Sequence, residues 1–161
     1  MFNPICLLTF KGHTYSIRSL VSHKGYLYSG SSDKTIKKWS EDGQCLLTIK
    51  GHTAPICSLV SYKGYLYSGS RDSTIKKWGE DGQCLLTIKD HTYYICSLVS
   101  HKGHLYSGSS DYTIKKWFCP NKDDIYDFML QYKEKLITKP YMSIYYQLLP
   151  ELKYEVIKFL L

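Results

Sequence analysis

The chain has 161 residues, a formal net charge of +7, and ordinary globular proportions of hydrophobic (43%) and charged (22%) residues. This composition excludes a disordered chain, and the length suits about one domain. No apolar run reaches the roughly 18 residues that a membrane-spanning helix needs, and the start lacks the basic and then apolar order of a secretory signal. We therefore expect an intracellular protein, cytoplasmic or nuclear, that does not contact a membrane.

A 39-residue period dominates the chain. Residues 11–49 and 50–88 differ at seven of 39 positions, and residues 89–117 repeat the first 29 positions once more. Residues 5–10 match the end of a unit, residues 44–49, so they are expected to form an additional outer strand. The period predicts a repeat region over residues 4–117, followed by a different segment over residues 118–161.

Each unit is predicted to fold as a four-stranded antiparallel meander. In the first unit, short runs rich in aromatic and β-branched residues alternate with turns that contain Gly, Ser and Asp, and these runs are residues 17–21, 26–30, 35–39 and 44–49. The runs are too short, and too often interrupted by Gly, for helices. The fold class is therefore all-β over the repeats.

The six cysteines do not form a metal-binding pattern. Five of them recur at the repeat period, and no Cys-x-x-Cys pair is present, which argues against a zinc ribbon or a dithiol redox site. We expect them to be small, half-buried strand residues, and we expect no metal and no cofactor.

A recurring set of residues resembles the WD-repeat family of β-propellers. In the first unit these residues are Gly12-His13 near the start, Asp33 in a polar turn, and Trp39 at the end of a strand. The usual Asp after the Trp is replaced by Ser40, Gly79 and Phe118. The resemblance implies three four-stranded propeller blades. Because closed propellers have about four to eight blades, the ring is incomplete, is closed by oligomerisation, or belongs to a fragment.

One repeated set has the residue types of a serine hydrolase triad. An active site needs one pocket, whereas this set occurs three times, and the resemblance implies a structural hydrogen-bond chain that also contains the Trp. We therefore expect no enzymatic activity. The three tetrads are His13, Ser29, Asp33 and Trp39; His52, Ser68, Asp72 and Trp78; and His91, Ser107, Asp111 and Trp117.

Differences between the repeats gather at one end of the predicted blades. The loops there become rich in Tyr and Arg, which are favoured at protein interfaces, and WD-repeat proteins mostly bind protein partners through this face. Drift of duplicated loops is the alternative. The predicted partner-binding residues are Tyr15, Arg18, Ser32, Lys34, Arg71, Ser73, Tyr93, Tyr94, Ser110 and Tyr112.

The basic surplus lies in residues 1–117, where lysine pairs such as Lys37-Lys38 recur on the third strand of each unit. Such a stripe could attract phosphates, but no Gly-rich phosphate loop or nucleic-acid-binding motif accompanies it. We expect solvated lysines on exposed strands, and a protein partner in preference to nucleic acid.

The segment after residue 117 is predicted to be a short helical tail. An apolar face over residues 125–136 and a second one over residues 150–160 indicate two amphipathic helices, which would cover the open edge of the blades. Residues 149–160 also resemble the opening helix of an F-box. The alternative function is therefore a substrate-recruiting adaptor of a cullin-type ubiquitin ligase, beside the favoured protein-interaction scaffold.

Overall fold

The computed structural model describes residues 3–119, which contain strands only. The helices expected over residues 125–136 and 150–160, and with them the F-box-like stretch, lie outside the described residues. The strands are β1 (Ile17–His23), β2 (Tyr26–Ser31), β3 (Ile36–Trp39), β4 (Cys45–Ile49), β5 (Ile56–Tyr62), β6 (Tyr65–Ser70), β7 (Ile75–Trp78), β8 (Cys84–Ile88), β9 (Ile95–His101), β10 (His104–Ser109) and β11 (Ile114–Trp117).

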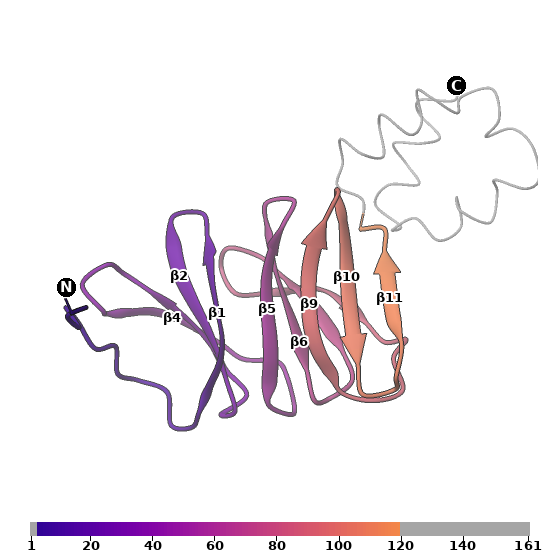
Figure 1. Cartoon of the computed structure of the whole chain (residues 1–161), viewed down its shortest axis with the longest axis horizontal. Helices are drawn as coiled ribbons and strands as arrows, with labels where there is room; N and C mark the ends of the chain where they lie inside the picture. Colours follow the sequence, from indigo (N-terminus) through magenta and orange to yellow (C-terminus); the bar gives the residue numbers. More distant parts are fainter. Residues whose placement is uncertain (1–2, 120–161) are drawn as a thin grey trace, which may run out of the picture. The chain divides into compact units, whose positions relative to one another are not determined.

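Three antiparallel sheets follow one another along the chain (Figure 1). The first sheet contains β1–β4 and the middle sheet β5–β8, each with its strands in chain order. The third sheet contains β9–β11. The all-β prediction of separate blade-like meanders is confirmed, and no closed barrel forms among the described strands.

Tight turns set the register within each sheet. The turn between β1 and β2 places Lys24 (φ 48°) and Gly25 (φ 77°) in the left-handed region, and His23 then pairs with Tyr26. Two consecutive residues with positive φ are what a two-residue hairpin of type I′ requires. The same Lys-Gly turn recurs between β5 and β6 and between β9 and β10. The repeated dipeptide therefore fixes the pairing of the first two strands in every sheet.

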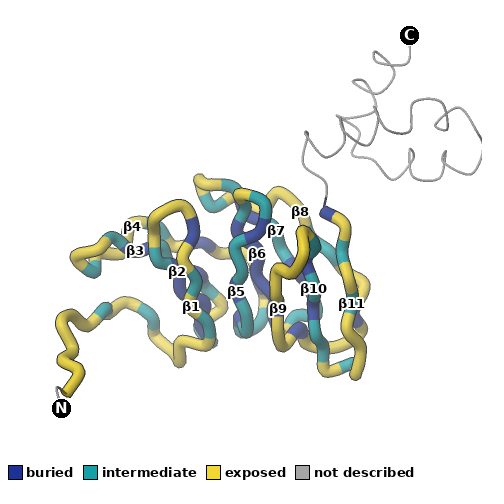
Figure 2. The backbone as a smooth tube through the Cα atoms, turned by 45° about the horizontal axis from the view of Figure 1, so that its top comes forward, coloured by how far each residue is buried: buried dark blue, intermediate teal, exposed yellow. Residues whose placement is uncertain are grey.

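The hydrophobic core lies between adjacent sheets. β5 packs beside β1 and β2, and β9 packs beside β5 and β6, so the first strands of the three sheets stand side by side (Figures 1 and 2). Figure 2 shows that the buried backbone concentrates in the middle sheet and in the strands that face it. The main buried cluster contains Tyr28, Ile36, Ile49, Ile56, Leu59, Leu66 and Trp78.

The third sheet differs from the expected four strands. Residues 5–10 are not in a strand, and β11 pairs with β10 alone among the described strands. The expectation of an additional outer strand is therefore not met within one chain. Residues 5–10 lead into β1, whereas the edge of β11 that has no partner strand within residues 3–119 belongs to the third sheet, on the far side of the middle sheet. One copy of the chain cannot bring this segment to that edge.

Four of the six cysteines are more exposed than expected. Cys6, Cys45, Cys84 and Cys96 are exposed, and Cys57 is half-buried. Cys45 and Cys84 begin β4 and β8, the outer strands of their sheets, and Cys6 lies in no strand. The expectation of half-buried strand residues is correct for Cys57 but wrong for these four, and for Cys45 and Cys84 the position in the sheet outweighs the apolar character of the thiol.

Candidate binding surface and buried hydrogen-bond tetrads

The middle sheet contains a tetrad of side chains joined by hydrogen bonds. His52 precedes β5, and its Nδ1 lies 2.7 Å from Oδ2 of Asp72 in the turn between β6 and β7. Its Nε2 lies 2.7 Å from Oγ of Ser68 in β6, and Nε1 of Trp78 donates to the same Oγ at 2.8 Å. Four residues that are far apart in the sequence thus tie the entry loop to two strands and their turn.

The other two sheets repeat this geometry. In the first sheet, His13 lies 2.7 Å from Asp33 and 2.6 Å from Ser29, and Trp39 donates to Ser29 at 2.8 Å. In the third sheet the corresponding distances are 2.6, 2.7 and 2.8 Å. Every predicted tetrad residue is therefore brought together with the other members of its own set.

The hydroxyl at the centre of each tetrad is already engaged. Ser68 is fully buried, and its oxygen accepts the Trp78 N–H while it faces His52 Nε2. Because Nδ1 of His52 donates its proton to the Asp72 carboxylate, Nε2 is an acceptor, and the Ser68 hydroxyl donates its one proton to it. A nucleophile needs open space on the side where a substrate would approach, and this hydroxyl has none. Within residues 3–119, no group of three His, Cys, Asp or Glu side chains could hold a metal ion.

A threonine that was not among the predicted residues joins each tetrad as a fifth member. The Thr35 hydroxyl donates to Oδ1 of Asp33 at 2.6 Å, and the Thr35 backbone N–H donates to the same oxygen at 2.9 Å. Thr74 and Thr113 bind Asp72 and Asp111 in the same way. The signal was present as an Asp-x-Thr spacing in all three units.

Hydrogen bonding keeps these carboxylates ionised. Burial alone raises the pKa of Asp33, but hydrogen bonds from the Thr35 hydroxyl, His13, and the backbone amides of Thr35 and Thr14 outweigh it and lower the pKa to about 2. The pKa of Asp72 is likewise held well below its usual range, against burial, by His52 and its threonine. A charged carboxylate therefore belongs to the folded state of each sheet at neutral pH.

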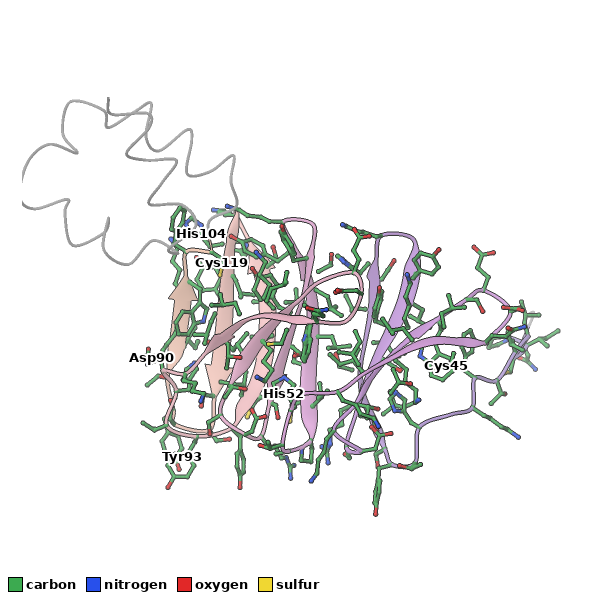
Figure 3. The ribbon with its side chains drawn as sticks, turned by 180° about the vertical axis from the view of Figure 1, so that it is seen from behind. Cys45, His52, Asp90, Tyr93, His104 and Cys119 are labelled. Carbon is green, nitrogen blue, oxygen red and sulfur yellow. The ribbon has the colours of Figure 1, made fainter. Side chains whose placement is uncertain are left out.

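The loops that carry the predicted partner-binding residues meet at one end of the sheets. Backbone amides in the turn after each second strand donate to carbonyls in the loop before each first strand. These bonds are Ser32 to Ser16, Arg71 to Pro55, and Ser110 to Tyr94, each at 2.9 Å. Figure 3 shows Tyr93 at this end and His104 at the opposite end. We call the predicted set, from Tyr15 to Tyr112, the loop surface.

The structure brings some loop-surface residues into contact with one another. The Arg71 guanidinium lies 5.7 Å from the centre of the Tyr94 ring, which joins the middle sheet to the third, and the Tyr93 ring lies edge-on to Tyr94 at 6.5 Å. Arg18 donates to the Ser32 hydroxyl within the first sheet. Arg71, Tyr94 and Tyr93 therefore form one connected cluster across two sheets.

The remaining loop-surface residues project separately. Tyr15 and Lys34 are exposed, and Tyr112 is 100% exposed at the tip of its turn. Lys34, Ser73 and Tyr112 hold the same turn position with φ between 64° and 70°. Ser73 is half-buried, and Ser110 is exposed with its hydroxyl 3.1 Å from the Cys96 thiol. The turn thus presents a different side chain at the same place in each sheet.

The lysines of the third strands contact neighbouring strands. Lys38 and Lys77 each place their ammonium group 3.6 Å from the centre of a tyrosine ring, Tyr26 and Tyr65 respectively. Lys37 donates to the Thr48 hydroxyl at 2.8 Å. These three lysines are half-buried and held in cation–π or hydrogen-bonding contacts, instead of being freely solvated as expected.

Comparison with known proteins identifies the repeats. The family model described as WD domain, G-beta repeat, matches residues 4–40, 43–79 and 82–117. The chain belongs to the WD-repeat family. Among curated proteins none matches it. This WD-repeat chain is similar to a solved structure titled "Structure of U3-55K", with 33% sequence identity and a TM-score of 0.63. The similarity covers 67% of this chain and 37% of that one, so the chain spans well under half of the protein it matches.

The WD-repeat match confirms the family resemblance drawn from the repeated Gly-His, Asp and Trp positions. Each matched stretch begins before a first strand and ends at or near a tetrad Trp. The second and third stretches therefore contain β4 and β8, the outer strands of the preceding sheets, and the first contains residues 5–10 in the corresponding place. In the part of the chain that the structure describes, no helix is long and apolar enough to cross a membrane.

Proposed function

We propose that this WD-repeat protein is a non-enzymatic interaction scaffold whose loop surface binds a protein partner. The observation that carries the proposal is the contrast between constant and variable positions. The tetrads and the Lys-Gly turns are maintained from unit to unit, whereas the exposed positions of the loop surface change. A binding platform needs a constant fold and a variable surface, and the tetrads with their turns provide the first while the loop surface provides the second.

The connected cluster of Arg71, Tyr94 and Tyr93 is the proposed centre of that surface. Tyrosine and arginine provide large, rigid contact area with polar ends, and they dominate binding energy at interfaces. Tyr93 and Tyr94 are exposed although both rings are hydrophobic, and Arg71 already lies beside one of them. A partner that covers this cluster would bury the apolar area of the two rings, and its own acceptors would have to pair with the Arg71 N–H groups.

A pull-down with the full chain tests the proposal. Proteins captured by the wild type, and identified by mass spectrometry, are expected to be lost from the Tyr93→Ala/Tyr94→Ala variant. The matched control is Gln83→Ala, which removes an exposed side chain from the turn between β7 and β8 at the opposite end. Equal capture by both variants would overturn the choice of surface.

We also propose that the tetrads are architectural. Their serines are buried, the three copies are equivalent, and each hydroxyl has two partners within its own sheet. A substrate would have to displace a buried Trp N–H bond to reach any of them. The expected result of His52→Ala is lower folding stability. A hydrolytic activity abolished by His52→Ala without a change in melting temperature would contradict this role.

The ubiquitin-ligase adaptor is retained as a second candidate through residues 149–160, which lie outside the described residues. Capture of the ligase's adaptor subunit by the full chain, and its loss in Leu149→Ala/Pro150→Ala, would support it. An intracellular location is also proposed, since exposed Cys45, Cys84 and Cys96 thiols suit a reducing compartment.

A further inference from the structure

The three sheets contact one another through a single interface that occurs twice. Between the first and middle sheets, Ile56 and Leu59 of β5 pack directly over Gly30 of β2, where an added Cβ would lie 2.7 Å from Cγ2 of Ile56. Between the middle and third sheets, Ile95 packs over Gly69 even more closely. Each interface thus needs an isoleucine on one sheet and a bare glycine on its neighbour.

A hydrogen bond recurs together with this packing. The backbone N–H of Leu59 donates to the Ser19 hydroxyl at 2.9 Å, and the N–H of Leu98 donates to the Ser58 hydroxyl at 3.0 Å. The two interfaces therefore agree in both apolar and polar contacts. The repeated sequence specifies how one sheet docks on the next.

The first sheet presents one half of this interface without a partner among the described residues. Ile17 and Leu20 of β1 occupy the positions of Ile56 and Leu59, yet they are 51% and 60% exposed, whereas Ile56 is 1% exposed. Two large apolar side chains on one face of a strand are left in solvent, although the same positions are buried in the next sheet.

The third sheet presents the other half. A Cβ added at Gly108, the equivalent of Gly30 and Gly69, would meet nothing within 4 Å. Ile114 of β11 is 79% exposed, although its equivalent Ile36 is 0% exposed. The glycine surface that receives an isoleucine elsewhere is therefore open at this end.

Among residues 3–119, no strand pairs with the outer edge of β11. Residues 5–10 match the sequence of the strand that fills this place in the other two sheets. In the first sheet Ile36 pairs with Ile49, and Lys37 reaches the Thr48 hydroxyl; Phe10 and Thr9 hold the corresponding sequence positions. Lys115, the equivalent of Lys37, turns instead to Asp90 and donates to its backbone carbonyl at 2.9 Å.

Docking of a second molecule on the third sheet would supply both the isoleucine over Gly108 and the strand beside β11. Within the chain, β4 completes the first sheet and leads directly to β5, which packs on that same sheet. Residues 5–10 lead to β1 in the same way. A molecule that places its β1 against the third sheet of another molecule therefore also brings its residues 5–10 to the open edge of β11.

We propose that two copies of this chain assemble head to tail into one closed ring. Ile17 and Leu20 of each copy pack over Gly108 of the other, and residues 5–10 of each copy pair with β11 of the other. Two copies provide six sheets, which falls within the four to eight blades of closed propellers. Because the two faces differ, the contact is heterologous, and a ring is the form in which every such contact is satisfied.

Light scattering on the full chain during size-exclusion chromatography tests the assembly. At micromolar concentration, the wild type is expected at twice the 18.7 kDa mass of one chain. A monomer would overturn the proposal. Masses that keep increasing with concentration would also overturn it, because they indicate an open fibre.

Three variants locate the interface. Gly108→Val places a side chain where Ile17 must pack, in space that is empty within one chain. Leu20→Ser removes an exposed apolar group, and Leu8→Pro/Thr9→Pro removes ladder N–H groups from a segment that is unpaired within one chain. Each is expected to weaken dimerisation about tenfold or more while leaving the far-ultraviolet circular dichroism unchanged.

The matched control is Leu85→Ser, which replaces an equally exposed leucine on β8, the outer strand of the middle sheet. It is expected to remain dimeric with wild-type affinity. Dimers that persist in all three interface variants, or that dissociate equally in Leu85→Ser, would show that another surface holds the copies together. Both results would contradict the proposal.

Discussion

The middle sheet and its two neighbours are built from nearly the same sequence but have different environments. Ile75 and Trp78 of β7 are buried, whereas the equivalent Ile114 of β11 is exposed and Trp117 is half-buried. β5 is buried at the positions where β1 is open. The difference shows that these residues are buried by an outer strand of their own sheet and by an adjacent sheet, and that β11 has neither among residues 3–119. Each sheet has its own hydrogen bonds, but its apolar burial depends on its neighbours.

The largest expected difference between the sheets comes from replacing the serine at the centre of a tetrad. Ser68→Ala leaves the Trp78 N–H and His52 Nε2 unpaired in a buried place, which is expected to lower the free energy of unfolding by about 2–5 kcal/mol. Ser107→Ala in the third sheet is expected to cost about 1–2 kcal/mol, because water can reach half-buried Trp117. Urea denaturation measures both, and equal losses would refute the contrast.

The interface glycines provide the next test. Gly69→Ala forces a Cβ against Ile95 and is expected to cost about 1–3 kcal/mol through overpacking. Gly108→Ala meets open space in the equivalent position of the third sheet and is expected to change the free energy of unfolding of one chain by less than about 0.5 kcal/mol. Denaturation is measured on dilute protein, where unfolding of one chain is observed. A large loss from Gly108→Ala would mean that this face is covered.

The pH dependence of the free energy of unfolding reports on the tetrad aspartates, whose hydrogen bonds come from their own sheet and not from a neighbouring one. The pKa of Asp33 is lowered to about 2, and the pKa values of Asp72 and Asp111 are also lowered, by donors within their own sheets. Unfolded aspartate has a pKa of about 3.9, so this stabilisation is complete above about pH 5 and is lost as the pH falls towards 2.

Urea denaturation across pH 2–7 measures this dependence. Replacing a tetrad aspartate, as in Asp72→Asn, is expected to flatten the acid limb, whereas Asp81→Asn in an exposed turn is expected to preserve it. If Asp33→Asn and Asp111→Asn differ strongly from Asp72→Asn, the carboxylates respond to neighbouring sheets and the local explanation fails.

The smallest expected effect concerns an ion pair between sheets. Lys24 of the first sheet contacts Glu80 of the middle sheet, and both side chains are well exposed. Exposed pairs contribute little because water and salt screen them. Glu80→Gln is expected to leave the melting temperature almost unchanged at low and at high salt. A marked decrease of the melting temperature that depends on salt would show that this ion pair, and not only apolar packing, holds the first and middle sheets together.

Much of the fold was predictable from the sequence because its signals are local. Alternating apolar runs and the repeated turns predicted the hairpins, which are confirmed. The period predicted three equivalent four-stranded sheets, which is confirmed except for the fourth strand of the third sheet. The tetrad residues recur at fixed spacings, and the resemblance to WD repeats implied that each set forms one hydrogen-bond chain. Asp-x-Thr recurs equally regularly, but a hydroxyl that supports a carboxylate is recognised only when the distances are known.

Other expectations could not be settled from the sequence alone. Residues 5–10 have the composition of a strand, but a strand needs a partner edge, and within one chain that edge is out of reach. The exposure of Cys45 and Cys84 was not predicted because the place of a strand at the edge of its sheet is decided by strand pairing. The role of the loop surface stays a prediction, although the contact between Arg71 and Tyr94 adds a connection that no spacing indicated.

The sequence by itself determined the strands, the turns, the basic charge and the membership of the WD-repeat family. These follow from residue types and short spacings, and they repeat because the sequence repeats. Tertiary structure alone decided which copies of one residue are buried and which are not. Ile17, Ile56 and Ile95 hold the same position, but only the last two have a sheet in front of them. Whether a side chain is buried depends on the sheet that packs against it as well as on its own residue type. Within residues 3–119, the first and third sheets each have such a neighbouring sheet on one side alone.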